Sequence, residues 1–584
     1  MKKIYLFLLA VLAGAAITSC SFTDVSPIDS ITDKSYWKNV NDLKLFANGL
    51  YGNLFAPTAA ADIDSDNIIS SSYRPILFDE TTLPASGGGW DWSGIRSCNF
   101  FLQRYQQVEG NQDEINKYVA EVRFFRGLLY YSKVRAFGDV PWYDKDLQTT
   151  DTEELYKPRD KRNFVIGKII EDMEYAIAWL PTPDKAEKGR LTKDAARTQL
   201  ARICLYYGTY MKYHGEADSD GITSRGLLEK AISLTNDVMN TGLYDIVKAT
   251  DAGAKQMAYD GYPLPYANLF VQEDLSTCKE NILCRYYELG VLAEDIGRSV
   301  QDYGVGLSKD FIESFLMKDG TPINNPGSGY QGDENQETEI AGRDPRLYNI
   351  IDNQHKPYLV TNGVRFQNLV ADCTNGFYVT GYPCTKYHSP NSQQSQARST
   401  FYDWFVYRYA EVLLINAEAN AELGTCTQDV LDRTINKLRD RVDMAHLTVN
   451  PVADAKPLNY GYPISNLLYE IRRERRIEMI VEDQRTDDLK RWNAMTLLEN
   501  PKTMFGIRIT PSVIEEYAAA NITFGGADGR PTAEFEGKTY LYQYPSKDIH
   551  DPHRKWTSTD RRWLSPIPTN ELALNPNLTQ NPGW

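Results

Sequence analysis

Histidine and cysteine are scarce in this sequence, and neither occurs in a familiar catalytic pattern. There are 6 His and 8 Cys among 584 residues. No serine lies in a Gly-x-Ser-x-Gly turn, no histidines have the His-Glu-x-x-His spacing, and the glycines of Gly87-Gly88-Gly89 lack the lysine of a phosphate-binding loop. We therefore expect no catalytic activity.

Positive charge is also in deficit. The chain has 63 Lys and Arg against 78 Asp and Glu, a formal net charge of -15, and an isoelectric point near 5.1. Binding to nucleic acid needs a basic face that meets the phosphates, so we expect no nucleic-acid partner. The mean hydropathy of -0.47 is typical of a well-solvated globule.

Long apolar runs are missing after the first residues, which have the pattern of an export signal. Lys2 and Lys3 precede an uncharged run, 4–16, that is too short to span a bilayer. The following Ile17-Thr18-Ser19-Cys20 resembles a lipobox. We predict a signal peptide over 1–19 and acylation of Cys20; the alternative is an ordinary signal with a chance cysteine. Several acyl chains on one cysteine would anchor the protein firmly to a membrane.

Seven cysteines remain after Cys20, and an odd number cannot all pair within one chain. The nearest pairs, Cys278 with Cys284 and Cys373 with Cys384, lack the double spacing of a zinc site. Cys204 lies on an apolar helix face. We expect buried thiols.

Helical periodicity dominates two parts of the chain, about 36–250 and 404–500. Apolar residues recur every three to four positions, as Val122, Phe125, Leu128 and Leu129 do. That stripe lies within 121–136, and further stripes of this kind lie within 166–177, 192–210, 410–421, 431–442 and 464–471. Paired helices with small alanine positions and large aromatic ones predict a mainly α fold of tetratricopeptide-like hairpins, with no strict repeat period.

The amino-acid composition changes between these helical parts. Residues of about 58–93 are rich in serine, aspartate, glycine and aromatics, and residues of about 250–403 carry glycine, asparagine, proline and tyrosine throughout. Two stretches of the longer segment, 357–370 and 376–386, alternate enough to predict short β-hairpins. Long irregular insertions are usually functional or disordered, and the aromatic content favours ordered and functional ones. We expect 500–584 to be an irregular C-terminal segment.

Several blocks of residues, spread over most of the chain, form a pattern that is specific through its order and spacing. In order, they are Trp37, Asn48-Gly49-Leu50-Tyr51, 120–128, 137–141, Asp344-Pro345-Arg346, 408–414, 417–419, Glu474-Arg475-Arg476, Arg485, Asp488-Leu489, Arg491-Trp492, 566–568, Glu571, Asn575-Pro576 and 580–583. Together these blocks resemble the SusD/RagB family of surface lipoproteins. One departure is Asp483, where the family usually has glycine after the glutamate.

The resemblance implies one SusD-like domain over 20–584 and a place on the surface of the outer membrane. It implies capture of an oligosaccharide and its delivery to a partner, a TonB-dependent outer-membrane transporter (SusC-like), which the protein caps like a lid. Two rivals remain, the same scaffold binding a peptide or another non-glycan nutrient, and a surface glycoside hydrolase.

The ligand site is expected in the irregular insertions. The resemblance points to Trp90, Trp92 and Asn99, while Tyr73 and Arg74 are candidates by proximity and Tyr287 and Tyr303 from the longer insertion are candidates to complete an aromatic platform. Aromatic planes stack on the C–H faces of sugars, and polar side chains bind the hydroxyls. The alternatives are that one tryptophan packs on the core under the glycine turn, and that Tyr287 and Tyr303 are core aromatics.

We interpret two clusters of charged residues as structural rather than as ligand sites. Asp62, Asp64 and Asp66 resemble the start of a calcium loop, but Asn67 and Tyr73 stand where glycine and glutamate are needed, so we expect no metal cofactor. The second cluster should be an ion-pair lock between helices rather than an anion site or a solvated face, because it holds both signs of charge. It consists of Glu474, Arg475, Arg476, Glu478, Arg485 and Asp488.

Overall fold

The computed structural model of this protein describes residues 36–59, 61–248, 265–302, 304–354, 356–359, 365–366 and 379–584. The predicted signal peptide, Cys20, Cys373 and Tyr303 lie outside the described residues. None of the described helices combines the length and the apolar character that crossing a membrane requires.

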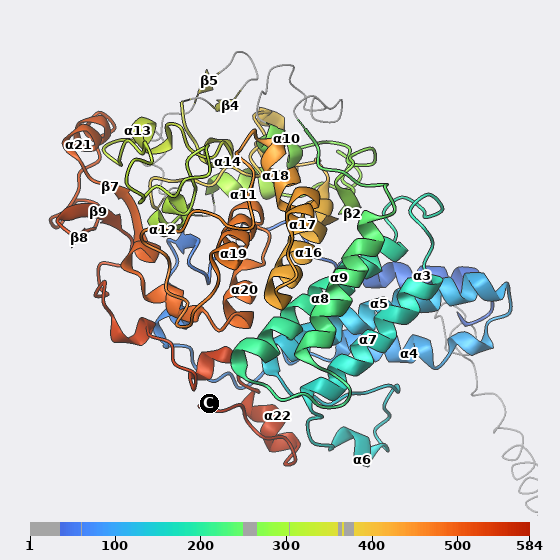
Figure 1. Ribbon diagram of the computed structural model, residues 1–584. Coiled ribbons are helices and arrows are strands. Elements are labelled where there is room, and N and C mark those ends of the chain that lie inside the picture. Colours follow the sequence, from blue (N-terminus) through green and yellow to red (C-terminus); the bar gives the residue numbers. More distant parts are fainter. Residues whose placement is uncertain are drawn as a thin grey trace, which may run out of the picture.

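The N-terminal part is a layer of helices that lie side by side, as predicted from the apolar stripes (Figure 1). Two shorter helices, α3 (Val40–Leu50) and α4 (Ser93–Leu102), pack on the first long one. The long helices are α5 (Gln112–Phe137), α7 (Arg162–Trp179), α8 (Lys193–His214) and α9 (Ser224–Met239).

Local signals set the ends of these helices. The Asn111 side chain accepts hydrogen bonds from two backbone N–H groups at the start of α5, and the Thr192 side chain caps the start of α8. Gly138 and Gly215 follow the two helices with φ of 75° and 66°. This left-handed backbone is open to glycine at little cost and ends a helix.

Helices α5 and α7 pack tightly as an antiparallel hairpin. Asn116 contacts Tyr175 near one end of the hairpin, and Arg126 binds Asp172 further along. A Cβ atom on Gly127 would lie 2.9 Å from Met173 Cε, so only glycine allows this approach without a shift. The mainly α, tetratricopeptide-like fold is confirmed.

A second group of helices begins after β6 (Trp404–Arg408) and packs on α8 and α9. The stripe over 431–442 does not form one helix, because the backbone of Thr434 (φ -126°, ψ -92°) interrupts it. The helices are α16 (Tyr409–Leu423), α17 (Gln428–Arg433), α18 (Ile435–Arg441), α19 (Asn466–Glu478) and α20 (Arg485–Arg491).

The two irregular insertions are joined to each other and to the helical parts by short antiparallel strand pairs. β1 (Ile68–Ser70), from the first insertion, pairs with β3 (Val305–Leu307), and β2 (Asn281–Arg285) pairs with β6. The longer insertion also holds the short helices α10 (Pro265–Leu269), α11 (Ile296–Asp302), α12 (Lys309–Glu313), α13 (Gln336–Ile340) and α14 (Arg346–Ile350). Another short helix, α6 (Thr152–Leu155), lies outside the insertions, in the loop after α5.

One of the two predicted hairpins is found. β4 (Pro357–Leu359) pairs with β5 (Arg365–Phe366). The other, over 376–386, is wrong for its described residues 379–386, which form no strand; Cys384 instead makes an isolated bridge with Ile351. The segment packs across α14 rather than on itself.

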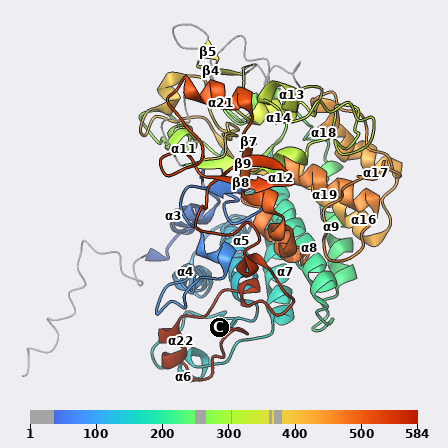
Figure 2. The same cartoon turned by 90° about the vertical axis from the view of Figure 1, so that its left-hand side faces the viewer.

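The C-terminal segment is more regular than its sequence indicated. It holds a three-stranded antiparallel sheet, in the order β7-β9-β8, at one edge of the molecule (Figures 1 and 2). Its elements are β7 (Phe505–Arg508), α21 (Pro511–Ala518), β8 (Thr532–Phe535), β9 (Lys538–Tyr542) and α22 (Thr569–Leu574).

The last helix, α22, lies beside α6 in both views, although more than 400 residues separate them (Figures 1 and 2). The side chain of Asn575, just after α22, donates to the backbone carbonyl of Lys157 at 3.0 Å. The C-terminus is therefore fastened to the N-terminal helical layer, where it forms one wall of a groove.

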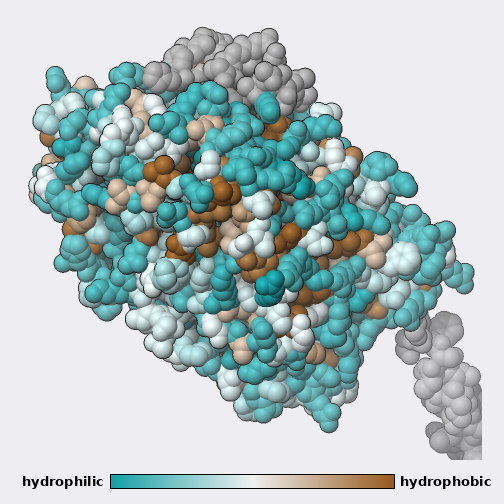
Figure 3. Space-filling view, viewed as in Figure 1, coloured by the Kyte–Doolittle hydropathy of each residue, from teal (hydrophilic) through white to brown (hydrophobic). Residues whose placement is uncertain are grey.

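Hydrophilic residues dominate the face of the molecule that Figure 3 shows.

Candidate functional site: an aromatic groove beside Trp92

Three of the predicted site residues, Trp90, Trp92 and Asn99, line one groove of about 380 Å³. Its walls come from the start of α4, the loop after α5, and helices α6 and α22. In the sequence, Trp90 and Trp92 lie at the end of the first insertion and Asn99 just after it. The groove has its α22 wall only because the C-terminal helix packs against the N-terminal layer.

Trp90 forms the floor of the groove. Glycines 87–89 have φ between 56° and 85°, and the turn closes with the Trp90 N–H donating to the Gly87 carbonyl at 2.9 Å. The turn directs Trp90 inward, where its side chain is 7% exposed and meets Phe137 edge-on at 4.8 Å. The alternative that one tryptophan packs on the core under the glycine turn is confirmed for Trp90.

Trp92 is half-buried and stands between the core and the groove. Its ring meets Trp90 at 5.3 Å and Tyr143 at 5.5 Å, both nearly perpendicular. The Lys133 ammonium lies 5.7 Å from its centroid. Contacts on several sides hold the ring in one orientation at the wall of the groove.

Asn99 supports the groove from below and is fully bonded. Its Nδ2 donates to the carbonyls of Tyr143 (2.8 Å) and Lys145 (3.2 Å), and its Oδ1 accepts from Arg126 at 2.9 Å. Asp172 in turn holds Arg126 through two bonds of 2.7 and 2.8 Å. Asn99 therefore positions the loop that carries Tyr143, and its amide is already occupied by the protein.

The groove has further walls that sequence reasoning missed. Tyr156 (46% exposed) and Leu574 (68% exposed) supply open apolar surface, and Arg96, Lys145 and Glu571 supply charges. For Tyr156 and Lys145 the only sequence signal was the aromatic and proline content of the loop after α5. Glu571 belongs to a block that carries the family resemblance, but nothing in the sequence placed it or Leu574 at the groove, because their approach depends on distant segments meeting in three dimensions.

Tyr73 and Arg74 do not join this groove. The Tyr73 ring stacks on Phe78 at 5.3 Å, and the Arg74 guanidinium forks onto Asp64 with two bonds of 2.7 Å. Neither residue lines the groove. Proximity in sequence was misleading because β1 and the turn after it carry this segment away from α4.

Tyr287 does not complete the platform either. Its side chain is 9% exposed and belongs to the apolar core of the longer insertion, and its backbone N–H donates to Asp403 at 3.0 Å. The alternative that it is a core aromatic is the correct one. The position of Tyr303 lies outside the described residues.

The three aspartates of the calcium-like stretch bind protein donors rather than a common centre. Asp66 binds Arg485 through two bonds of 2.8 Å, Asp64 binds Arg74, and Asp62 accepts the backbone N–H groups of Val481 and Arg485. In the part of the chain that the structure describes, no group of three or more His, Cys, Asp or Glu is placed to hold a metal ion.

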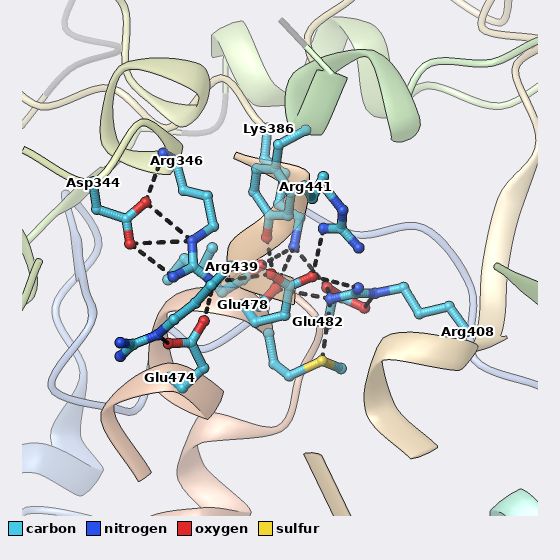
Figure 4. Close-up of polar contacts among 12 residues, drawn as sticks. Asp344, Arg346, Lys386, Arg408, Arg439, Arg441, Glu474, Glu478 and Glu482 are labelled. Carbon is cyan, nitrogen blue, oxygen red and sulfur yellow. Dashed lines mark hydrogen bonds and ion pairs between the residues drawn. The ribbon is translucent and has the colours of Figure 1, made fainter. Parts of the chain in front are cut away.

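The predicted ion-pair lock is confirmed and is larger than the sequence indicated (Figure 4). Glu478 Oε1 accepts from Arg408 at 2.7 Å and from Arg441 at 2.8 Å, and Glu478 Oε2 accepts from Arg346 at 3.2 Å. One carboxylate thus joins α14, β6, α18 and α19. Arg346, Arg408 and Arg441 came from motif blocks and helices far apart in sequence, which is why sequence reasoning left them out of the cluster.

The free-energy cost of burying these charges is offset by their attraction to the opposite charges around them. Burial by itself would raise the pKa of the Glu478 carboxyl, but Arg441, Arg408 and Arg346 outweigh it and hold the pKa well below its ordinary value. Arg346, Arg408 and Glu478 are each at most 1% exposed in their side chains. The network is therefore a structural lock and leaves no open face for an anion.

The cysteines agree with the prediction of buried thiols. Cys98, Cys204, Cys278, Cys284 and Cys384 are free and buried, and Cys426 is free and half-buried. Burial raises the pKa of the Cys98 and Cys204 thiols to about 12. Such thiols are unreactive at neutral pH.

Comparisons with known proteins agree with this architecture. The model of the SusD family matches residues 294–584, and a model described as "Starch-binding associating with outer membrane" matches 89–205. SusD-like protein P2 of Formosa agariphila is 23% identical over 509 residues, which cover 84% of this chain and 90% of the relative. SusD-like protein P38 of the same organism is 21% identical over 526 residues, covering 86% and 93%.

Solved structures share the fold. A SusD-like protein from Bacteroides fragilis superposes with a TM-score of 0.68 at 23% identity, covering 96% of this chain and 100% of that one. A SusD-like carbohydrate binding protein from the same species gives a TM-score of 0.65 at 22% identity, covering 93% and 100%. The two family models, the relatives along most of the chain and the shared fold together make this protein a member of the SusD-like family.

Proposed function

We propose that this protein is an outer-membrane lipoprotein, anchored through Cys20, that binds an oligosaccharide in the groove beside Trp92. It then delivers the oligosaccharide to a TonB-dependent transporter of the same membrane. The observation that carries the binding step is the groove itself, in which fixed aromatic rings and charged side chains meet. The anchor and the transporter are proposed from the lipobox-like sequence and from the family.

The chemistry of the groove suits a sugar. Sugar rings present flat C–H faces, which pack on aromatic and aliphatic surface such as Trp92, Tyr156 and Leu574. Sugar hydroxyls bind charged groups, which Arg96, Lys145 and Glu571 supply at the same groove. Both signs of charge are present, so the groove favours a neutral chain over a polyanion.

The family supports the same class of ligand. One matching family model is described as starch-binding and associated with the outer membrane, and a solved relative is described as a carbohydrate binding protein. We infer a carbohydrate for this chain as well. The identity of the sugar and its linkage depend on side chains of this groove that the relatives need not share.

Affinity electrophoresis in gels that contain single polysaccharides tests the binding step. We expect at least one polysaccharide to retard the wild-type protein, and Trp92→Ala and Tyr156→Ala to lose most of that retardation. Trp179→Ala is the matched control, because Trp179 is 40% exposed on α7 and does not line the groove. Retention of binding by both groove variants would assign the ligand elsewhere.

The same preparation separates the rival functions. A peptide ligand would give retardation by no polysaccharide and saturable binding of an oligopeptide mixture. A hydrolase would release shorter products during prolonged incubation with the bound polysaccharide. We expect neither result.

The anchor and the partner need a test in cells. We expect wild-type protein to incorporate a fatty-acid label and to fractionate with the outer membrane, and Cys20→Ala to do neither. A TonB-dependent transporter should co-purify with the wild-type protein after mild detergent extraction. Co-purification that is equal with an unrelated lipoprotein would count against a specific partner.

A further inference from the structure

A second cleft, separate from the groove beside Trp92, lies where the two groups of helices meet. Its walls are the faces of α5, α8, α16 and α20, together with strand β6. It encloses about 210 Å³, far more than the roughly 10–15 Å³ that one water molecule needs. No residue lines both this cleft and the groove.

Three buried donors border this cleft and have no hydrogen-bond partner among the described residues. They are Gln199 Nε2, Trp404 Nε1 and Arg475 Nη1. The three residues are between 0% and 3% exposed. A buried donor without an acceptor costs free energy, so donors at the wall of a cavity indicate an occupant that accepts hydrogen bonds.

Apart from Asp483, which forms no ion pair among the described residues, the charged side chains that line the cleft are paired within the protein. Arg202 binds Glu411 through two bonds of 2.5 and 2.7 Å, Arg408 binds Glu482, and Arg135 binds Asp487. No cation or anion is left over in these pairs to neutralise a charged ligand. The electrostatics therefore favour a neutral occupant.

The remaining wall is aromatic. Tyr131, Tyr206 and Phe405 face the same cleft as the orphan donors. The Asp483 carboxylate also borders it and supplies an acceptor for hydroxyl groups. Rings for C–H faces, donors for oxygen lone pairs and an acceptor for hydroxyls are the complement of a polyhydroxylated ring.

We propose that this cleft is a second ligand site, which takes a single neutral sugar ring held by the N–H groups of Gln199, Trp404 and Arg475. The site does not depend on the groove beside Trp92. Its enclosure suits a monosaccharide, whereas the groove along α4, α6 and α22 suits a longer chain. The protein would then bind free sugar and oligosaccharide at different places.

Titration of monosaccharides into the Trp92→Ala protein tests this proposal with the groove disabled. The probes are D-glucose, D-galactose, D-mannose, D-xylose and N-acetyl-D-glucosamine, with D-glucuronate as a charged comparison, followed by calorimetry and saturation-transfer NMR. We expect at least one neutral sugar to bind saturably and D-glucuronate to bind more weakly. Absence of saturable binding by every neutral sugar would mean that the cleft holds water only.

Two matched variants then locate the binding. Trp404→Phe keeps an aromatic ring, smaller than the indole, and removes one N–H, and losing one hydrogen bond should raise the Kd about threefold to tenfold. The control is Trp556→Phe, because Trp556 Nε1 is another buried indole without a partner among the described residues, but it lies in a different apolar cluster and away from the cleft. Equal affinities of the two variants would overturn the assignment.

A third variant tests the amide donor. Gln199→Glu keeps the oxygen that accepts from Tyr407 at 2.9 Å and removes the N–H₂ group. We expect weaker sugar binding in this variant with its circular dichroism spectrum unchanged. Full affinity in Gln199→Glu and Trp404→Phe together would also overturn the proposal.

Discussion

Arg408 Nη1 and Glu478 Oε1 lie 2.7 Å apart, although 70 residues separate them in the chain. Arg408 ends β6, the strand that pairs with the long insertion, and Glu478 ends α19 in the second helical group. The pair therefore fixes the insertion to the helical scaffold. Since both side chains are nearly inaccessible to water, neither can be satisfied by solvent if the other is removed.

Removal of the Glu478 charge should be strongly destabilising. In Glu478→Gln, Arg346, Arg408 and Arg441 lose their shared carboxylate, and breaking a buried pair of this kind costs about 3–5 kcal/mol. Chemical denaturation followed by circular dichroism measures the loss. Glu171→Gln is the control, since Glu171 pairs with Lys168 on the surface and should change stability little. Similar results for the two variants would contradict the role of the lock.

Acid should unfold the protein partly through Asp66. Burial opposes ionisation of this carboxyl, but Arg476 and Arg485 outweigh burial and lower its pKa from 3.8 to about 2. A lowered pKa in the folded state gives stability that is present above pH 3.8 and is lost as the pH falls through about 2. The contribution at neutral pH is about 2 kcal/mol.

Melting temperatures measured across this pH range test the contribution of Asp66. We expect Asp66→Asn to melt lower than wild type at neutral pH and to lose less on acidification. Asp528→Asn, at an exposed position, serves as the control and should follow the wild-type curve. Parallel curves for Asp66→Asn and wild type would rule out Asp66 as a source of acid lability.

Asp483 occupies a turn that suits glycine. Its φ is 56°, in the left-handed region. The turn is therefore kept in this protein, although aspartate replaces the glycine that the family usually has here. Aspartate tolerates this backbone at a cost, and a β-branched residue tolerates it poorly. We expect Asp483→Gly to raise the free energy of unfolding by up to about 1 kcal/mol and Asp483→Val to lower it by about 1–2 kcal/mol.

Asp483→Ala separates the backbone from the charge in the same denaturation experiment. Burial raises the pKa of Asp483, with Asp487 nearby acting in the same direction, so loss of the carboxylate could itself stabilise the protein. Alanine removes the carboxylate but keeps the Cβ atom. A gain in Asp483→Ala equal to that in Asp483→Gly would assign the effect to charge rather than to the backbone.

Much of the scaffold could be predicted from local patterns. The apolar stripes predicted α5, α7, α8, α16 and α19, because a helix is specified by residues three and four positions apart. Thr434 shows the limit, since the stripe continues across it while the backbone does not. The strands of the C-terminal sheet were missed because each is only four or five residues long. β8 and β9 form a tight hairpin, and β7 joins them across more than 30 residues of chain.

The candidate site was predicted only in part. Trp90, Trp92 and Asn99 do lie together, because the glycine turn and the start of α4 hold them within a few residues of one another. Tyr73, Arg74 and Tyr287 do not, because the tertiary contacts of β1 and of the longer insertion place them elsewhere. Nearness in sequence identified the floor of the groove and gave no information about its walls.

The sequence by itself determined the helical scaffold, the thiol burial and the chemistry of the charged motif, since these depend on periodicity, composition and residue type. Only the tertiary structure decided which arginines surround Glu478, which aromatic residues remain open beside Trp92, and that α22 closes the groove. Those features depend on contacts between segments tens to hundreds of residues apart. Such contacts are set by packing and by pairing of buried charges, which no local pattern encodes.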